Sequence, residues 1–148
     1  MQTDNLYREY LIRLEVVRES SKPLQVCSPK EILDIIRERL GKTDREFLIA
    51  VFLSNANTVN SIQEVSIGTL DRALFSAREI LKAAVISNSQ SIIMLHSHPS
   101  GSIIPSREDI RATHVVKAAA RLFSITLLDH LVVGSDGKYY SFKESGKL

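Results

Sequence analysis

The sequence predicts an α/β domain with a mixed β-sheet, and three observations support this. The apolar run of residues 47–53 and the segment 91–95, which is apolar after Ser91, have the length of strands that are buried on both faces. Three amphipathic segments with helix-start signals are interspersed with the strands. The chain ends with two strand-like segments around a turn, the pattern of a β-hairpin. Helices mixed with central strands and a terminal hairpin are typical of an α/β fold.

Each expected helix begins with a serine that is followed three residues later by Glu or Asp, which is the sequence form of a capping box. These serines are Ser28, Ser76 and Ser106, and Pro29 adds a proline at the first helical position. Apolar residues at helical spacing follow the first of these starts. The expected helices span residues 28–40, 76–88 and 106–122.

The other expected strands span residues 6–18, 58–67, 125–133 and 139–142, with a turn at residues 135–137 between the last two. No internal repeat, low-complexity tract or linker divides the sequence. Residues 1–148 are therefore expected to form one domain, for which no oligomeric state is predicted.

Composition limits the classes of protein to which the chain can belong. An apolar fraction of 44% and a charged fraction of 24% are those of a folded globular protein, which excludes a disordered tail. The net charge is only +2 and the basic residues are scattered, so nucleic-acid binding receives little support.

The single cysteine, Cys27, excludes an intrachain disulfide and a cysteine-based zinc cluster, and we interpret it as structural. One cysteine suits a reducing compartment. Residues 1–14 contain no secretory apolar segment, and no apolar run is long enough to span a bilayer. A cytoplasmic protein that does not interact with a membrane is therefore expected.

The residues that carry chemistry follow the second apolar run, in the segment His96-Ser97-His98-Pro99. In an extended chain His96 and His98 project to the same side, because side chains alternate with a period of two. Pro99 favours extended geometry at His98. Two imidazoles on one side of a strand end are suitable zinc ligands.

Asp109 is the expected third ligand. A loop of residues 97–105, which contains two prolines and a glycine, lets the next helix return to the strand end, and Asp109 lies in its first turn. Two histidines and one carboxylate leave the fourth position of a tetrahedral zinc ion for water, whose pKa the metal lowers. These residues predict one catalytic zinc ion per chain.

Each part of this pattern also has an ordinary explanation. A His-x-His pair alone is more often a pair of loop histidines with local hydrogen bonds. Ser106 and Asp109 form a capping box, which alone indicates only a helix start. The metal interpretation rests on the combination of these features. Of the other histidines, His130 is interpreted as a hydrogen-bonded core residue, and His114 is expected on the third helix, away from the metal.

With these residues in view, the sequence closely resembles the JAB/JAMM (MPN+) metalloprotease domain, and within it the RadC-like branch. The family pattern is His-Ser/Thr-His-Pro and, seven residues after the second histidine, Ser-x-x-Asp. Here His98 is followed, after residues 99–105, by Ser106 and Asp109 without a gap. The elements shared with the RadC branch span about residues 46–146 and include residues 67–70, 78–79, 99–101 and 129–130.

The resemblance implies a three-layer α/β/α sandwich of the cytidine-deaminase-like type. It also implies hydrolysis of a peptide or isopeptide bond in a peptide or protein substrate. Glu46, before the first apolar run, would take a proton from the zinc-activated water and give it to the leaving amine. Without the resemblance, Glu46 is better explained as a surface charge at a strand start. Ser106 would help hold the oxyanion, in addition to capping its helix.

Two departures from the RadC branch bear on function. RadC proteins usually carry a helix-hairpin-helix module ahead of this domain, and this chain is expected to have no room for one, which weakens a role in DNA repair. The usual RadC motif is His-Asn-His, whereas Ser97 gives the form that is common in active JAMM peptidases. Ser97 therefore favours catalysis.

Three functions remain open from the sequence. The first is a zinc metallopeptidase. The second is a protein of DNA repair or another DNA transaction, either an accessory factor or a metal-dependent nuclease, which needs a basic surface that the composition does not show. The third is a non-catalytic interaction module in which the metal is structural or absent.

Overall fold

The computed structural model describes residues 22–40, 46–67, 76–98, 100–134 and 137–148. The expected strand over residues 6–18 lies outside the described residues, as do residues 68–70, Pro99 and residues 135–136 of the expected hairpin turn. Within the described part of the chain, no helix is both long and apolar enough to cross a membrane.

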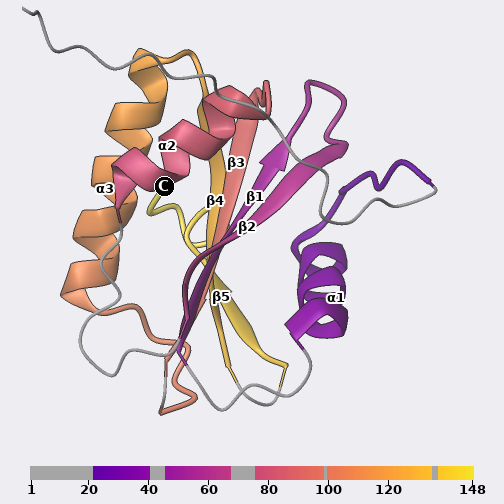
Figure 1. Cartoon of the computed structure of the whole chain (residues 1–148). Helices are drawn as coiled ribbons and strands as arrows, with labels where there is room; N and C mark the ends of the chain where they lie inside the picture. The colour runs from indigo at the N-terminus through magenta and orange to yellow at the C-terminus, as the bar shows by residue number, and fades with distance from the viewer. Residues whose placement is uncertain (1–21, 41–45, 68–75, 99, 135–136) are drawn as a thin grey trace, which may run out of the picture.

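One mixed sheet lies at the centre of the described structure, with its strands in the order β2-β1-β3-β4-β5 (Figure 1). The strands are β1 (Phe47–Leu53), β2 (Val59–Ile67), β3 (Ser91–Ser97), β4 (Thr126–Val133) and β5 (Tyr139–Ser141). β3 and β4 are parallel, whereas the other neighbouring pairs are antiparallel. Because parallel neighbours need a long crossover connection, which is usually a helix, the segment between β3 and β4 is expected to contain one. The mixed sheet predicted from the sequence is confirmed.

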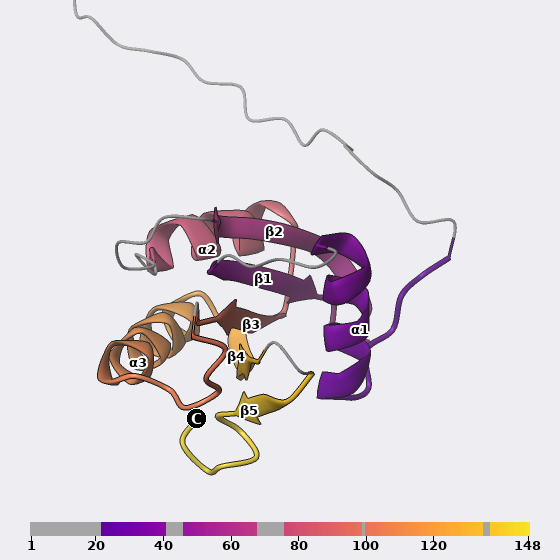
Figure 2. The ribbon, with the colours of Figure 1, turned by 90° about the horizontal axis from the view of Figure 1, so that it is seen from below.

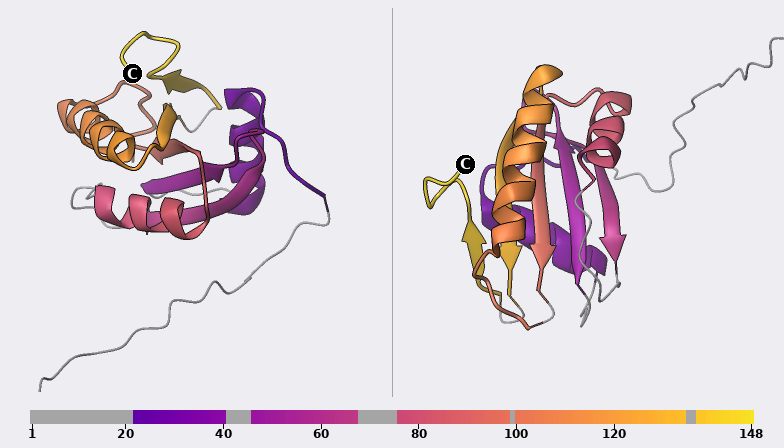
Figure 3. Two further views of the ribbon diagram at one scale, coloured as in Figure 1. Left: turned by 90° about the horizontal axis from the view of Figure 1, so that it is seen from above. Right: turned by 90° about the vertical axis from the view of Figure 1, so that its left-hand side faces the viewer.

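Helices cover both faces of this sheet and give a three-layer α/β/α sandwich (Figure 2). They are α1 (Pro29–Leu40), α2 (Ala77–Ile86) and α3 (Arg107–Leu122). The right-hand view of Figure 3 shows α2 and α3 in front of the sheet and α1 behind it. α3 is the crossover between β3 and β4. The fold class implied by the family resemblance is therefore confirmed.

β1 lies between the two hydrophobic cores, and all of its residues are buried. Ile49 and Val51 pack with α1 on one face of the sheet. Ala50 and Phe52 pack with α2 and α3 on the other face. This alternation is the period of two of an extended chain. Even-numbered residues of β1 therefore face the α2–α3 side.

A bulge in β4 changes which of its side chains face α3. Ile92 pairs with Leu127, but Ile93 pairs with Asp129, so Leu128 is an extra residue in β4. Such an extra residue reverses the alternation of the side chains that follow it. His130 consequently lies on the α3 side of the sheet.

The observed helices agree with the expected ones to within two residues at each end. Ser76 and Ser106 are N-caps, as their capping-box patterns predict. The informative difference is β3, which runs to Ser97 instead of ending near residue 95. His96 and Ser97 are therefore held by backbone hydrogen bonds of the sheet.

Candidate metal centre

His96 and His98 lie at the carboxyl end of β3, and their rings converge. Their Nε2 atoms are 3.0 Å apart, as expected for side chains two residues apart in an extended chain. His96 is fully buried, and its backbone pairs with Leu48 of β1 and Val132 of β4. The side chain of His98 is 15% exposed. One histidine is thus held within the sheet, while the other is accessible to solvent.

Asp109 reaches the same point from the first turn of α3. Its Oδ1 lies 3.2 Å from His96 Nε2, and its Oδ2 lies 3.1 Å from His98 Nε2. The same carboxylate completes a capping box with Ser106. The Ser106 N–H donates to Asp109 Oδ2 at 2.6 Å, and the Asp109 N–H donates to Ser106 Oγ at 3.1 Å. The helix cap therefore directs the carboxylate towards the two histidines.

The surroundings of Asp109 keep its carboxyl group ionised. Burial raises the pKa of a carboxyl group, because it penalises the charged form. The contact with the His96 ring and the hydrogen bonds with Ser106 outweigh that effect and hold the pKa of Asp109 well below its usual range. The positive end of the α3 dipole acts in the same direction. Asp109 is therefore an anionic donor at neutral pH.

These three donor groups fit a single metal ion. Their ligand atoms all lie within 4.8 Å of one another. The two histidine Nε2 atoms are 3.0 Å apart, and the nearest carboxylate oxygen of Asp109 is 3.2 Å from that of His96 and 3.1 Å from that of His98. Donors that bind one ion at about 2.0–2.2 Å lie about 3–3.5 Å from each other. His96, His98 and Asp109 can therefore hold a metal ion. Three protein ligands leave at least one coordination position for another molecule.

The loop after β3 orients the ring of His98. His98 Nδ1 lies 2.9 Å from the Ser102 carbonyl oxygen, and this nitrogen must carry the proton because a carbonyl only accepts. The Nε2 lone pair is then available to a metal. Gly101 closes the loop, since its N–H donates to the His98 carbonyl at 2.9 Å and its φ is +70°. Glycine adopts this left-handed conformation without strain.

Glu46 lies on the same side of the sheet as the three donor residues. Leu48 pairs with His96, and alternation along the extended chain places Glu46 and Leu48 on one face. The neighbouring Phe47 N–H donates to Ser97 Oγ at 3.3 Å, which fixes the backbone next to Glu46. Glu46 is half-buried and does not belong to the donor cluster.

Ser106 can serve as both a helix cap and a hydrogen-bond donor to a substrate. Its Oγ accepts the N–H of Asp109, which uses a lone pair and not the hydroxyl proton. The residue is exposed at the edge of the donor cluster. The hydroxyl can therefore donate to a substrate oxygen while the cap remains intact.

Comparison with known proteins assigns the family. The family model of the RadC-like JAB domain matches residues 26–147. The chain belongs to this family. The resemblance deduced from the sequence motifs is therefore confirmed, and the matched range includes the three donor residues together with Glu46 and Ser106.

Several similar proteins are named UPF0758 proteins. One from Methanosarcina acetivorans is 38% identical over 134 residues, which are 90% of this chain and 58% of that protein. One from Rubrobacter xylanophilus is 38% identical over 136 residues, which are 92% of this chain and 59% of that protein. One from Desulfitobacterium hafniense is 40% identical over 132 residues, which are 87% of this chain and 58% of that protein. The chain thus spans less than two thirds of the length of these relatives.

The other histidines lie where the sequence predicts them, whereas Cys27 differs. His130 is a buried, hydrogen-bonded residue outside the donor cluster, and burial lowers its pKa well below the usual value. His114 is exposed on α3. Cys27 does not contribute a buried structural side chain, because its thiol is exposed. Its backbone N–H donates to Glu31 Oε2 at 2.7 Å at the start of α1.

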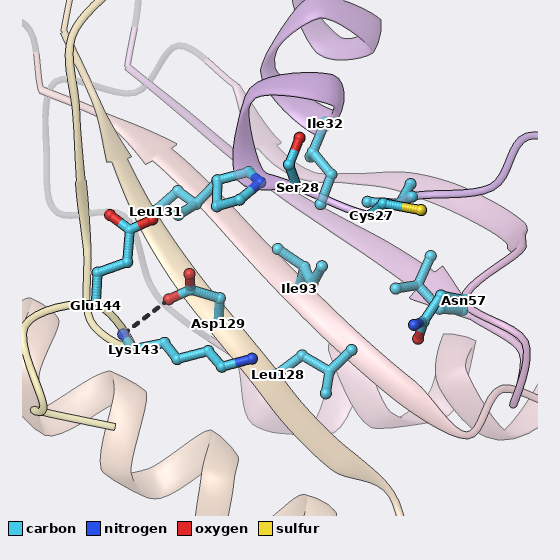
Figure 4. A pocket seen from close by; sticks show the side chains of 13 residues that line it. Cys27, Ser28, Ile32, Asn57, Ile93, Leu128, Asp129, Leu131, Lys143 and Glu144 are labelled. Atoms are coloured by element: carbon cyan, nitrogen blue, oxygen red, sulfur yellow. Dashed lines mark hydrogen bonds between the residues drawn. The ribbon is translucent and has the colours of Figure 1, made fainter.

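A pocket of about 460 Å³ lies on the opposite face of the sheet (Figure 4). It is found between the start of α1 and β4, and Ile32, Ile93 and Leu131 form part of its apolar wall. These residues belong to the core on the α1 side. The sheet therefore separates this pocket from the donor cluster, and none of the three donor residues lines it.

The sequence does not predict two contacts behind His96. His96 Nδ1 lies 2.8 Å from His130 Nε2, and His130 Nδ1 lies 2.7 Å from Thr113 Oγ1. A partial signal exists, because the Asp129-His130 pair is one of the elements shared with the RadC branch. Thr113 lies four residues after Asp109 on the buried face of α3, where a polar side chain needs a partner.

Proposed function

We propose that this RadC-like JAB domain is a zinc-dependent peptidase that hydrolyses a peptide or isopeptide bond. The observation that carries the proposal is the convergence of His96, His98 and Asp109 on one point, where the side chain of His98 is 15% exposed. Catalytic zinc sites have three protein ligands, whereas structural sites have four. Imidazole and carboxylate donors are common ligands of zinc.

The residues around the centre can perform the proton transfers of amide hydrolysis. Zinc bound at this centre would lower the pKa of a water molecule and polarise the carbonyl oxygen of the substrate. Glu46 takes a proton from the attacking water as the water oxygen bonds to the carbonyl carbon. Ser106 donates a hydrogen bond to the carbonyl oxygen, which gains negative charge. When the C–N bond breaks, Glu46 returns the proton to the leaving nitrogen, so the products are a carboxylic acid and an amine.

Metal removal tests this proposal directly. The full chain, freed of metal with a chelator and then reloaded with one equivalent of zinc, should cleave members of a library of peptides and ε-linked isopeptides. New amine groups detected by mass spectrometry would report cleavage. Reloading with Mn²⁺ or Fe²⁺ in parallel samples tests the identity of the metal. The proposal fails if the zinc-loaded chain releases no more amines than the metal-free chain.

Ser106→Ala should lower kcat/KM by about 10²–10³-fold, because one donor to the carbonyl oxygen is lost. It should also lower the free energy of unfolding by about 0.5–2 kcal/mol, because α3 loses its cap. Kinetics and denaturant unfolding measure the two effects separately.

Ser76→Ala is the matched control for this variant. Ser76 caps α2 by accepting the Glu79 N–H at 3.4 Å, in a helix that contributes no residue to the donor cluster. Its loss should cost similar stability and leave kcat/KM unchanged. Equal activities for the Ser106 and Ser76 variants would restrict Ser106 to the role of a helix cap.

A further inference from the structure

We propose that Thr113 and His130 form a positioning relay that fixes His96 in the tautomer that offers its Nε2 lone pair to the metal. The inference rests on the metal binding of the proposed function, but not on the reaction that follows. Neither residue is a ligand: His130 contacts the ring nitrogen of His96 that faces away from the donor cluster, and Thr113 contacts His130.

Three short hydrogen bonds connect the backbone of α3 to His96. The Thr113 hydroxyl donates to the Asp109 carbonyl oxygen at 2.6 Å. Thr113 Oγ1 lies 2.7 Å from His130 Nδ1, and His130 Nε2 lies 2.8 Å from His96 Nδ1. Thr113, His130 and His96 are all 0% exposed, so bulk water does not compete for these contacts.

The donor in each contact follows from the first hydrogen bond. A hydroxyl group has one proton, and Thr113 gives it to the Asp109 carbonyl, so Thr113 Oγ1 accepts from His130 Nδ1. A fully buried imidazole is neutral and has a single N–H, because burying an isolated charge is costly. His130 Nε2 is therefore an acceptor, and His96 Nδ1 donates to it. The remaining lone pair of His96 is on Nε2, which faces Asp109.

The opposite arrangement is incompatible with metal binding. If His130 carried its proton on Nε2, His96 would have to accept at Nδ1 and carry its own proton on Nε2. That N–H would point at the carboxylate of Asp109, and a protonated nitrogen has no lone pair for a metal. The hydroxyl at residue 113 therefore decides the metal-binding form of His96 through one intervening ring.

The fold constrains His130 from several sides. The extra residue Leu128 in β4 places His130 on the α3 side of the sheet. Its ring stacks on Phe142, with ring centroids 4.9 Å apart and planes 13° apart. The His130 backbone N–H donates to Asp129 Oδ1 at 2.7 Å, and its carbonyl accepts from the Phe142 N–H at 3.1 Å. These contacts leave the ring little freedom to turn away from His96.

Two substitutions at residue 113 separate the effect of the hydroxyl group on zinc binding from the effect of side-chain shape. Thr113→Val keeps the shape and loses the hydroxyl, whereas Thr113→Ser keeps the hydroxyl and loses the methyl group. Zinc affinity, measured by competition with a chromophoric chelator, should fall about 10–100-fold in the valine variant, because His130, the partner of the ligand His96, is no longer held in the right tautomer. The serine variant should bind zinc nearly as well as the natural chain. Equal affinities of the two variants would overturn the relay.

The tautomer of His130 gives a second readout that needs no substitution. Long-range ¹H–¹⁵N correlation spectra of the natural chain should show the His130 proton on Nδ1, with and without zinc. A proton on Nε2 would overturn the relay, whatever the zinc affinity. If the natural chain does not bind zinc, the proposed function is contradicted. The His130 spectrum would still show the direction of the hydrogen bond between His130 and His96.

Discussion

Glu46→Gln should lower kcat for amide hydrolysis by about 10²–10⁴-fold and leave zinc binding unchanged. Glutamine is close to glutamate in size and can form hydrogen bonds, but it does not take up a proton at neutral pH. Because Glu46 is not one of the three donor residues, zinc affinity should be that of the natural chain. Turnover at saturating zinc and chelator competition on the same sample measure both quantities.

Glu108→Gln is the matched control for the loss of a carboxylate near the centre. Glu108 is exposed in the first turn of α3, next to Asp109. The substitution removes the same charge, but the proposed mechanism assigns no proton transfer or substrate contact to Glu108. It should leave kcat close to that of the natural chain. Equal losses of turnover in the two variants would exclude Glu46 as the proton-transfer group.

His98→Ala should weaken zinc binding by about 10²–10³-fold. Zinc sites with four protein ligands bind with apparent free energies of about 10–16 kcal/mol, which is about 2.5–4 kcal/mol per ligand. His98 is the donor best suited to this test because its side chain is the most exposed of the three and belongs to neither hydrophobic core. Isothermal titration or chelator competition would measure the loss.

Thermal unfolding gives an independent measure of the same effect. Zinc at 100 times its Kd should add about 2.7 kcal/mol to the stability of the natural chain, or about 5–10 °C in Tm for a domain of this size. His114→Ala is the control, because His114 is exposed on α3. Zinc should raise the Tm of the His114 variant as in the natural chain, and much less that of the His98 variant. An equal rise in Tm with zinc for both variants would show that His98 is not a zinc ligand.

The parts of the fold and of the centre that depend on local rules could be predicted from the sequence. The capping boxes at Ser76 and Ser106 depend on residues three positions apart, and both serines cap their helices as predicted. The convergence of His96 and His98 depends only on the alternation of an extended chain, and their Nε2 atoms meet. Asp109 approaches them because the same cap directs its carboxylate.

The contacts behind His96 could not be predicted, because they depend on pairing between distant strands. His130 reaches His96 only because Leu128 is an extra residue in β4, and a register change of one residue would turn His130 to the α1 side. No local pattern around Leu128 indicates this bulge. Glu46 is a related case, since only the family resemblance distinguished it from a surface charge at the start of a strand.

The coordination of zinc in the natural chain tests the central claim most directly. X-ray absorption at the zinc edge, with one equivalent of zinc per chain, counts and identifies the donor atoms. We predict two imidazole nitrogens from His96 and His98, oxygen from Asp109 and one oxygen from solvent. A zinc coordination shell without two imidazoles would contradict the proposed ligands. A fourth protein donor would leave no position for water and would contradict a catalytic role.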